Sequence, residues 1–161
     1  MQVRRRLRAC SEAGAVAVEF ALIMPLLLLL VFGIIDFGWM INRDMLVDNA
    51  SRDGARVASL GGTFNQVCTA VKSELSASGV TVPTTCNLTS TPTTVTTIKV
   101  DCVKTTGAAC NATSSNYDAQ AVSGTTAIVT ITYNHRWITP LTTGVFGRTR
   151  PIVETSQMVV E

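Results

Sequence analysis

The longest apolar run of this chain, from Phe20 to Ile35, contains no charged residue and is preceded directly by Glu19. A helix of about 20 apolar residues can cross a bilayer. A single segment does so as a helix, because its backbone polar groups must be satisfied within the segment. A carboxylate at the edge of such a segment is costly and usually serves a function. We therefore expect a membrane-spanning helix over residues 15–41 in which Glu19 has a specific role.

Three residues give this span internal landmarks. Pro25 removes a backbone donor and should bend the helix or loosen its hydrogen bonding. Phe37 and Trp39 follow the apolar run, where aromatic rings favour the membrane interface. A secretory signal peptide is the alternative, but the run is long for one and no small-x-small cleavage site follows it. We favour a span that stays with the exported part of the chain.

The charge distribution indicates the topology of the span. Residues 1–14 form a basic leader with four arginines, whereas nine of the thirteen basic and eight of the eleven acidic residues lie from Phe37 onward. Basic residues stay in the cytoplasm, so the N-terminus is predicted inside and residues 42–161 outside. The exported part is nearly neutral and has no electrostatic footprint for nucleic acid. The lipid bilayer is therefore the first partner that the sequence predicts.

The cysteines fit this topology. Cys10 lies in the leader, on the reducing side, and the other four lie in the exported part: Cys68, Cys86, Cys102 and Cys110. An even number of cysteines in an oxidising compartment predicts two disulfides. Three pairings exist, and we favour Cys68–Cys86 with Cys102–Cys110, because both close short loops. Four buried free thiols are the alternative; the spacings fit no zinc site.

The exported part reads as a small α+β head. Apolar residues at helical spacing extend the first helix over about residues 42–60, and a second helix is predicted over about 64–78, with Thr63 and Gln66 as a capping box and Gly79 at its end. Strands are expected over residues 95–103, 127–133 and 152–160, with a shorter one around 80–82. An exposed polar loop, held in place at Cys110, is expected over residues 104–120. The predicted fold class is α+β, with an antiparallel sheet packed on the helices.

Catalytic chemistry is not indicated by the sequence. An enzyme would have to rely on Asp101, Asp118 and the single histidine, His135, which we expect at the surface or at a strand edge. These residues form no known catalytic motif, and there is no phosphate loop, metal-binding motif or nucleophile elbow. We expect a protein that is not an enzyme and has no cofactor or metal.

The N-terminal segment resembles a known processing motif. Gly14 is followed by Ala15-Val16-Ala17-Val18-Glu19-Phe20, which resembles the cleavage region of type IV prepilins. The longer stretch GAVAVEFALIMPLLLLLVFGIIDFG, followed by DNASRDGARVA, is similar to the TadE-like family of the Flp, or tight-adherence, pilus system. This resemblance covers about residues 14–58. Related pseudopilins often have Glu-Tyr where this chain has Glu19-Phe20, which keeps the ring.

The resemblance implies a mechanism. A prepilin peptidase would cut between Gly14 and Ala15, so that Ala15 carries a free amine and Glu19 becomes the fifth residue. Glu19 would then pair with the terminal amine of a neighbouring subunit, which offsets the burial of both charges and fixes the register of the subunits. Glu19 extending to the inner headgroups is the alternative.

The same resemblance implies partners and a location. The partners would be the prepilin peptidase, the major pilin and other minor pilins, and the pilus assembly platform of the inner membrane. The protein would be a single-pass protein of the bacterial cytoplasmic membrane that enters or anchors the pilus as a minor pilin or pseudopilin. The alternative function is an uncleaved envelope protein that acts as a scaffold or binding module of the same apparatus.

Overall fold

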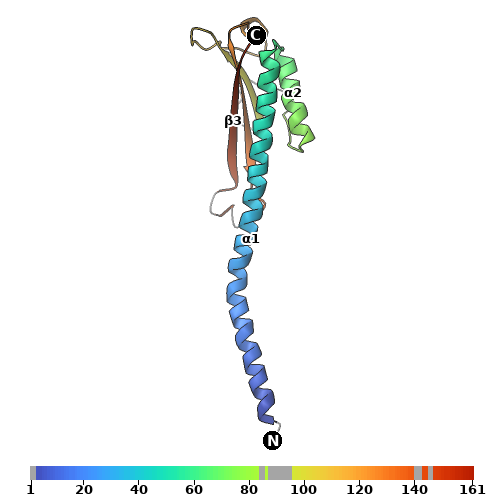
Figure 1. The fold of residues 1–161 in the computed structure, drawn as a ribbon, viewed down its shortest axis with the longest axis vertical. Helices are drawn as coiled ribbons and strands as arrows, with labels where there is room; N and C mark the ends of the chain where they lie inside the picture. The colour runs from blue at the N-terminus through green and yellow to red at the C-terminus, as the bar shows by residue number, and fades with distance from the viewer. Residues whose placement is uncertain (1–2, 84–85, 87–95, 140–142, 145–146) are drawn as a thin grey trace.

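The chain folds into one long helix that carries a small head on its C-terminal half (Figure 1). The computed structural model describes residues 3–83, 86, 96–139, 143–144 and 147–161, with side chains from Gly14 onward. In chain order the elements are α1 (Val3–Ser59), α2 (Phe64–Ala77), β1 (Thr96–Val103), the single turn α3 (Tyr117–Gln120), β2 (Thr126–Arg136) and β3 (Thr149–Val159). The α+β fold predicted from the sequence is confirmed.

Helix α1 unites the leader, the predicted span and the first head helix in 57 residues. At about 1.5 Å per residue it is about 85 Å long. Pro25 lies inside it, and the helix continues on both sides with a gentle curve in Figure 1. Its two halves have different surroundings: large apolar side chains are exposed from Val16 to Ile41, whereas the part beyond Met45 buries one face in the head.

Helix α2 begins and ends as the sequence predicts. The backbone N–H of Thr63 donates to Gln66 Oε1 at 2.9 Å, and the Gln66 N–H donates to Thr63 Oγ1 at 3.4 Å, which makes a capping box. Gly79 follows the C-terminal turn with φ of 69°, a left-handed conformation that glycine adopts without strain. The predicted apolar stripe is buried throughout: Phe64, Val67, Cys68, Val71 and Leu75.

The sheet contains three antiparallel strands in the order β1-β2-β3. Ile98 pairs with Ile131 and Val100 with Val129, so these buried side chains lie on one face. Helix α1 packs against β2 and β3, and α2 packs against α1 and contacts β1. The core of the head is therefore the layer between this face and the two helices.

One prediction of local structure was wrong and another was incomplete. Residues 80–83 form no strand; Val80 is buried, and the Thr81 carbonyl accepts a bond of 2.7 Å from Thr96 Oγ1. The segment from Lys104 to Gln120 is not simply an exposed loop, because Tyr117 is fully buried against Phe64. In each segment a buried side chain holds the backbone in place, and the sequence pattern alone does not show this contact.

The two disulfides join the preferred pairs. Cys68 on α2 is bonded to Cys86, and Cys102 on β1 is bonded to Cys110. All four residues are buried in the core of the head. The first bond attaches the segment after α2 to that helix, and the second closes the turn that follows β1.

Candidate functional sites along the long helix

The residues of the processing motif lie on one exposed stretch of α1. Gly14, Ala15, Glu19 and Phe20 are all helical and exposed. A Cβ built on Gly14 would meet no described atom within 4 Å outside the adjacent helix backbone. Packing within the described chain therefore does not require glycine at position 14.

Glu19 has no partner among the side chains that the structure describes. The residues one turn away from it have aliphatic side chains that cannot bind a carboxylate: Ala15, Val16, Leu22 and Ile23. The adjacent Val18 and Phe20 are more than 60% exposed. If this part of α1 is surrounded by lipid, the carboxylate must find its partner at the membrane surface or on another molecule.

Asp36 marks the opposite end of the apolar run, and it is fully buried. Its Oδ1 accepts a bond of 3.1 Å from the Ile138 backbone N–H. Its Oδ2 accepts bonds from the Thr139 N–H at 3.3 Å and the Thr139 hydroxyl at 2.5 Å. Hydrogen bonds from several donors offset the cost of burying a carboxylate. Asp36 therefore attaches the segment after β2 to the long helix.

Aromatic rings surround this attachment. Trp137 packs edge-on against Phe37, with ring centroids 5.6 Å apart, and against His135, at 5.2 Å. His135 is 1% exposed and lies one residue before the end of β2, so of its two predicted places the surface was wrong. Burial lowers the pKa of its imidazole; Asp36 acts in the opposite direction and Arg43 in the same direction. We infer a neutral His135 that serves packing at the end of the sheet.

Arg43 ties the same region to α2. Its guanidinium carbon lies 4.5 Å from the centroid of the Trp39 ring, a cation–π arrangement. Its Nη1 donates a bond of 2.8 Å to the Ser78 carbonyl at the end of α2. Asp36, Arg43, Trp137 and His135 form the end of the head nearest the apolar half of α1, and we call this end the base.

The three residues considered for catalysis do not meet. Asp118 accepts a bond of 2.6 Å from the Phe64 N–H at the start of α2, and Asp101 forms an ion pair of 3.4 Å with Lys99. Asp101 pairs with Ile128, seven residues along β2 from His135, which is about 24 Å. The described residues also hold no group of three or more histidine, cysteine or acidic side chains that could bind a metal. The geometry supports no active site built from these residues.

The fold defines a class of protein: an α+β head on a single long helix that exposes large apolar side chains from Val16 to Ile41. This helix is long and apolar enough to cross a membrane, which is compatible with a single-pass membrane protein. Residues 14–56 match the model of the family described as TadE-like protein, which confirms the resemblance seen in the sequence. The match covers about a quarter of the chain and links it to the Tad/Flp pilus system. Comparisons with curated proteins and with solved structures found no match.

The matched segment ends inside the head, and three of its residues make contacts there that depend on the residue type. Asp36 is the attachment point of the base. Gly54 lies where α1 crosses α2 and the sheet: a Cβ there would overlap Val71 Cγ2 and approach Val129 Cγ1 to 3.3 Å. Ser51, in the same turn, shares a bond of 2.7 Å with Ser156 Oγ on β3. The sequence indicated a helix here, but it did not show which residues touch the sheet.

Proposed function

We propose that the protein is a minor pilin or pseudopilin of the Flp, or tight-adherence, pilus system. It is held in the bacterial inner membrane by the apolar half of α1, with residues 1–14 in the cytoplasm and the head outside. Prepilin peptidase removes the leader after Gly14. The observation that carries this proposal is the TadE-like match over residues 14–56, which begins at Gly14 itself.

The geometry of Gly14 supports cleavage at this point. Glycine in a helix is about 1 kcal/mol less favourable than alanine, so α1 unwinds more readily at Gly14 than it would at an alanine. A peptidase that needs an extended substrate gains access there. Because packing in the described chain does not require this glycine, its presence fits a demand made by another protein.

The exposure of Glu19 supports a role in assembly. After cleavage, Ala15 carries a positive charge, and Glu19 is the nearest carboxylate on the helix. In lipid, a carboxylate without a cation is strongly disfavoured, whereas an ion pair with the terminal amine of a neighbouring subunit offsets that cost. Such a pair also fixes the axial position of one subunit against the next. The major pilin, other minor pilins and the assembly platform are the partners in this scheme.

The mature N-terminus tests the proposed processing. When the full chain is co-expressed with the prepilin peptidase, sequencing should give a first residue of Ala15, and Gly14→Ala should leave the leader in place. Gly33→Ala is the matched control, because Gly33 lies in the same helix with open space around it. An intact leader on the wild-type protein in piliated cells would contradict the proposal and favour an uncleaved scaffold.

The role of Glu19 is tested separately. Glu19→Gln should leave the head folded but reduce pilus formation, because glutamine cannot pair with an amine by charge. Asp53→Asn removes an exposed carboxylate from the same helix, in the head, and should have no effect. Normal piliation with Glu19→Gln would indicate that the protein acts through its head alone.

A further inference from the structure

The base of the head lies close to the end of the apolar run. Asp36, the first residue after that run, is bonded directly to Ile138 and Thr139. If α1 spans the bilayer as proposed, this attachment places residues 137–139 at the outer edge of the hydrocarbon layer. Ile138 is 60% exposed and Trp39 is 43% exposed there, as expected for side chains that face the interface.

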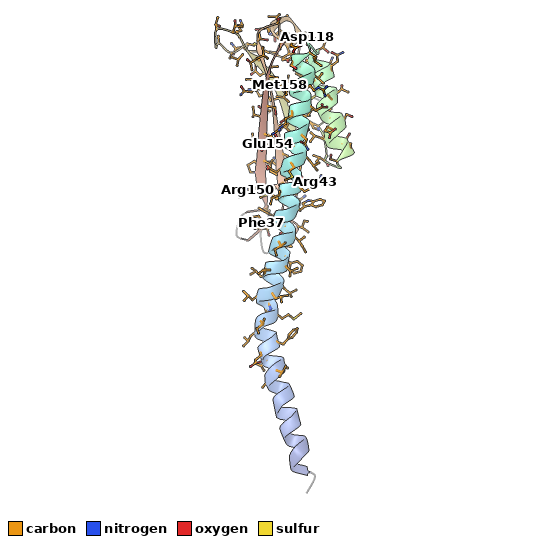
Figure 2. All side chains as sticks on the ribbon, in the orientation of Figure 1. Phe37, Arg43, Asp118, Arg150, Glu154 and Met158 are labelled. Atoms are coloured by element: carbon orange, nitrogen blue, oxygen red, sulfur yellow. A yellow bond between two sulfur atoms is a disulfide. The ribbon has the colours of Figure 1, made fainter. Side chains whose placement is uncertain are left out.

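Three arginines gather at this end of the sheet. Arg136 ends β2, Arg150 lies opposite His135 on β3, and Arg148 precedes β3 by one residue. All three are exposed, and none forms an ion pair in the described part of the chain. The connecting segment 137–147 contains no acidic residue. Figure 2 shows Arg150 above Phe37, toward the apolar half of α1.

The nearby acidic groups leave these charges uncompensated. Asp36 is buried and occupied by its three donors. Asp44 lies eight residues further along α1, about 12 Å from the level of Asp36. Glu154 lies four residues beyond Arg150 on β3, about 13 Å along the strand, and burial followed by the charges of Asp44 and Asp48 raises its pKa. The base therefore presents a net positive surface.

The distances match the depth of a headgroup layer. Arg136 precedes Ile138 by two residues, so its Cα lies within about 7 Å of the Ile138 Cα. Arg150 is on the adjacent strand, roughly 5 Å away from β2. Each headgroup layer of a bilayer is roughly 5–7 Å thick, and an arginine side chain extends about as far, so all three guanidinium groups can reach phosphates.

We propose that Arg136, Arg148 and Arg150 form a binding surface for the anionic phospholipid headgroups of the leaflet on which the head sits. This inference rests on the proposed topology, and it adds a second contact with the membrane beyond the span. Guanidinium groups bind phosphate through paired hydrogen bonds, and clustered arginines attract anionic lipid. The contact would hold the head in one orientation before the subunit leaves the membrane for the filament.

The intrinsic fluorescence of the protein provides a local test. Its two tryptophans, Trp39 and Trp137, both lie at the base. The full chain is placed in nanodiscs that contain phosphatidylcholine and phosphatidylglycerol at a fixed ratio, with bromine on the acyl chains of one lipid or the other. Enrichment of anionic lipid at the base should make brominated phosphatidylglycerol the stronger quencher by roughly twofold, and salt should reduce the difference.

Two triple variants assign the effect. Arg136→Gln/Arg148→Gln/Arg150→Gln should abolish the difference between the two brominated lipids. Arg52→Gln/Arg56→Gln/Lys104→Gln removes the same charge from exposed residues away from the base and should retain it. Arg43 is left unchanged in both because it holds Trp39 and Ser78. Circular dichroism confirms that both variants are folded.

The outcomes separate the inference from the topology. Equal quenching by the two lipids, or a preference that survives the loss of the three arginines, overturns the headgroup site and leaves the span intact. No quenching by either lipid means that the base is remote from the bilayer, which overturns the proposed topology itself.

Discussion

Replacement of Asp36 with asparagine should detach the base of the head from the long helix. The carboxylate accepts one bond at Oδ1 and two at Oδ2, from Ile138 and Thr139. Asparagine can keep the bond from Ile138 and donate to the Thr139 hydroxyl, but its amide then faces the Thr139 N–H. The Thr139 N–H loses this acceptor, which costs about 1–3 kcal/mol, and the remaining bonds lose their charge assistance.

Removal of the buried charge also removes its desolvation cost, which partly offsets the loss of the hydrogen bonds. With helix propensity nearly unchanged between the two residues, we expect the free energy of unfolding to fall by about 2 kcal/mol. Asp36→Ala, which removes the acceptor of all three bonds, should cost about 4 kcal/mol. The main prediction is that Asp36→Ala lowers the free energy of unfolding more than Asp36→Asn does.

Urea unfolding of the full chain in detergent, with the disulfides intact, measures this loss through tryptophan fluorescence. A loss of about 2 kcal/mol should lower the midpoint by roughly 1–2 M. Hydrogen exchange of the Ile138 and Thr139 amides gives the local effect, and roughly thirtyfold faster exchange is expected. Asp53→Asn, an exposed substitution on the same helix, should change stability by less than about 0.5 kcal/mol. If Asp36→Asn behaved like this control in both measurements, the attachment would not depend on the carboxylate.

Three further predictions concern the head. Gly54→Ala should lower the free energy of unfolding by about 1–2 kcal/mol, because its methyl group overlaps a valine of α2, whereas Gly38→Ala meets open space and should be neutral or stabilising in the same urea titration. The pKa of His135 is lowered in the folded head, so the unfolded chain binds the proton first, and stability should fall as pH drops below about 6.5. In His135→Phe, the thermal midpoint should change less between pH 7 and pH 5.5 than it does in the wild-type protein. Replacing Cys68 and Cys86 with alanine should cost about 3 kcal/mol by calorimetry, more than opening the shorter loop of the second disulfide.

The helices were predictable because their signals are local. The capping box at Thr63 and the left-handed Gly79 define α2 within a few residues of sequence, and its apolar stripe repeats at helical spacing. The pattern of α1 is equally local: an apolar run of span length, followed by a stripe that faces one side. Each signal depends on neighbours along the chain, so no knowledge of the tertiary fold was needed.

The strands were predicted in place but not in extent. Strand β2 continues three residues beyond the predicted end at Tyr133, because Asn134, His135 and Arg136 pair with β3. Strand β3 begins before Pro151, a residue that argues against a central strand but is tolerated at the edge of a sheet. Cross-strand pairing extends both elements, and the sequence of one strand does not show its partner.

The base was beyond sequence analysis because its contacts join distant segments. Asp36 and Thr139 are separated by 103 positions, and nothing around either residue specifies the other. The sequence assigned no role to Asp36, and it predicted His135 at the surface or at a strand edge. Only the packing of β2 against α1 brings them together and buries both.

The two carboxylates at the ends of the apolar run, Asp36 and Glu19, differ in where their partners come from. Asp36 lies in the matched family segment, yet its donors come from outside it, so the head completes that site within one chain. Glu19 has no such donor in the described residues, and no folding of the head can supply one at the other end of the span. Loss of Asp36 should therefore damage a single molecule in detergent. Loss of Glu19 should leave that molecule intact and become visible only when subunits assemble.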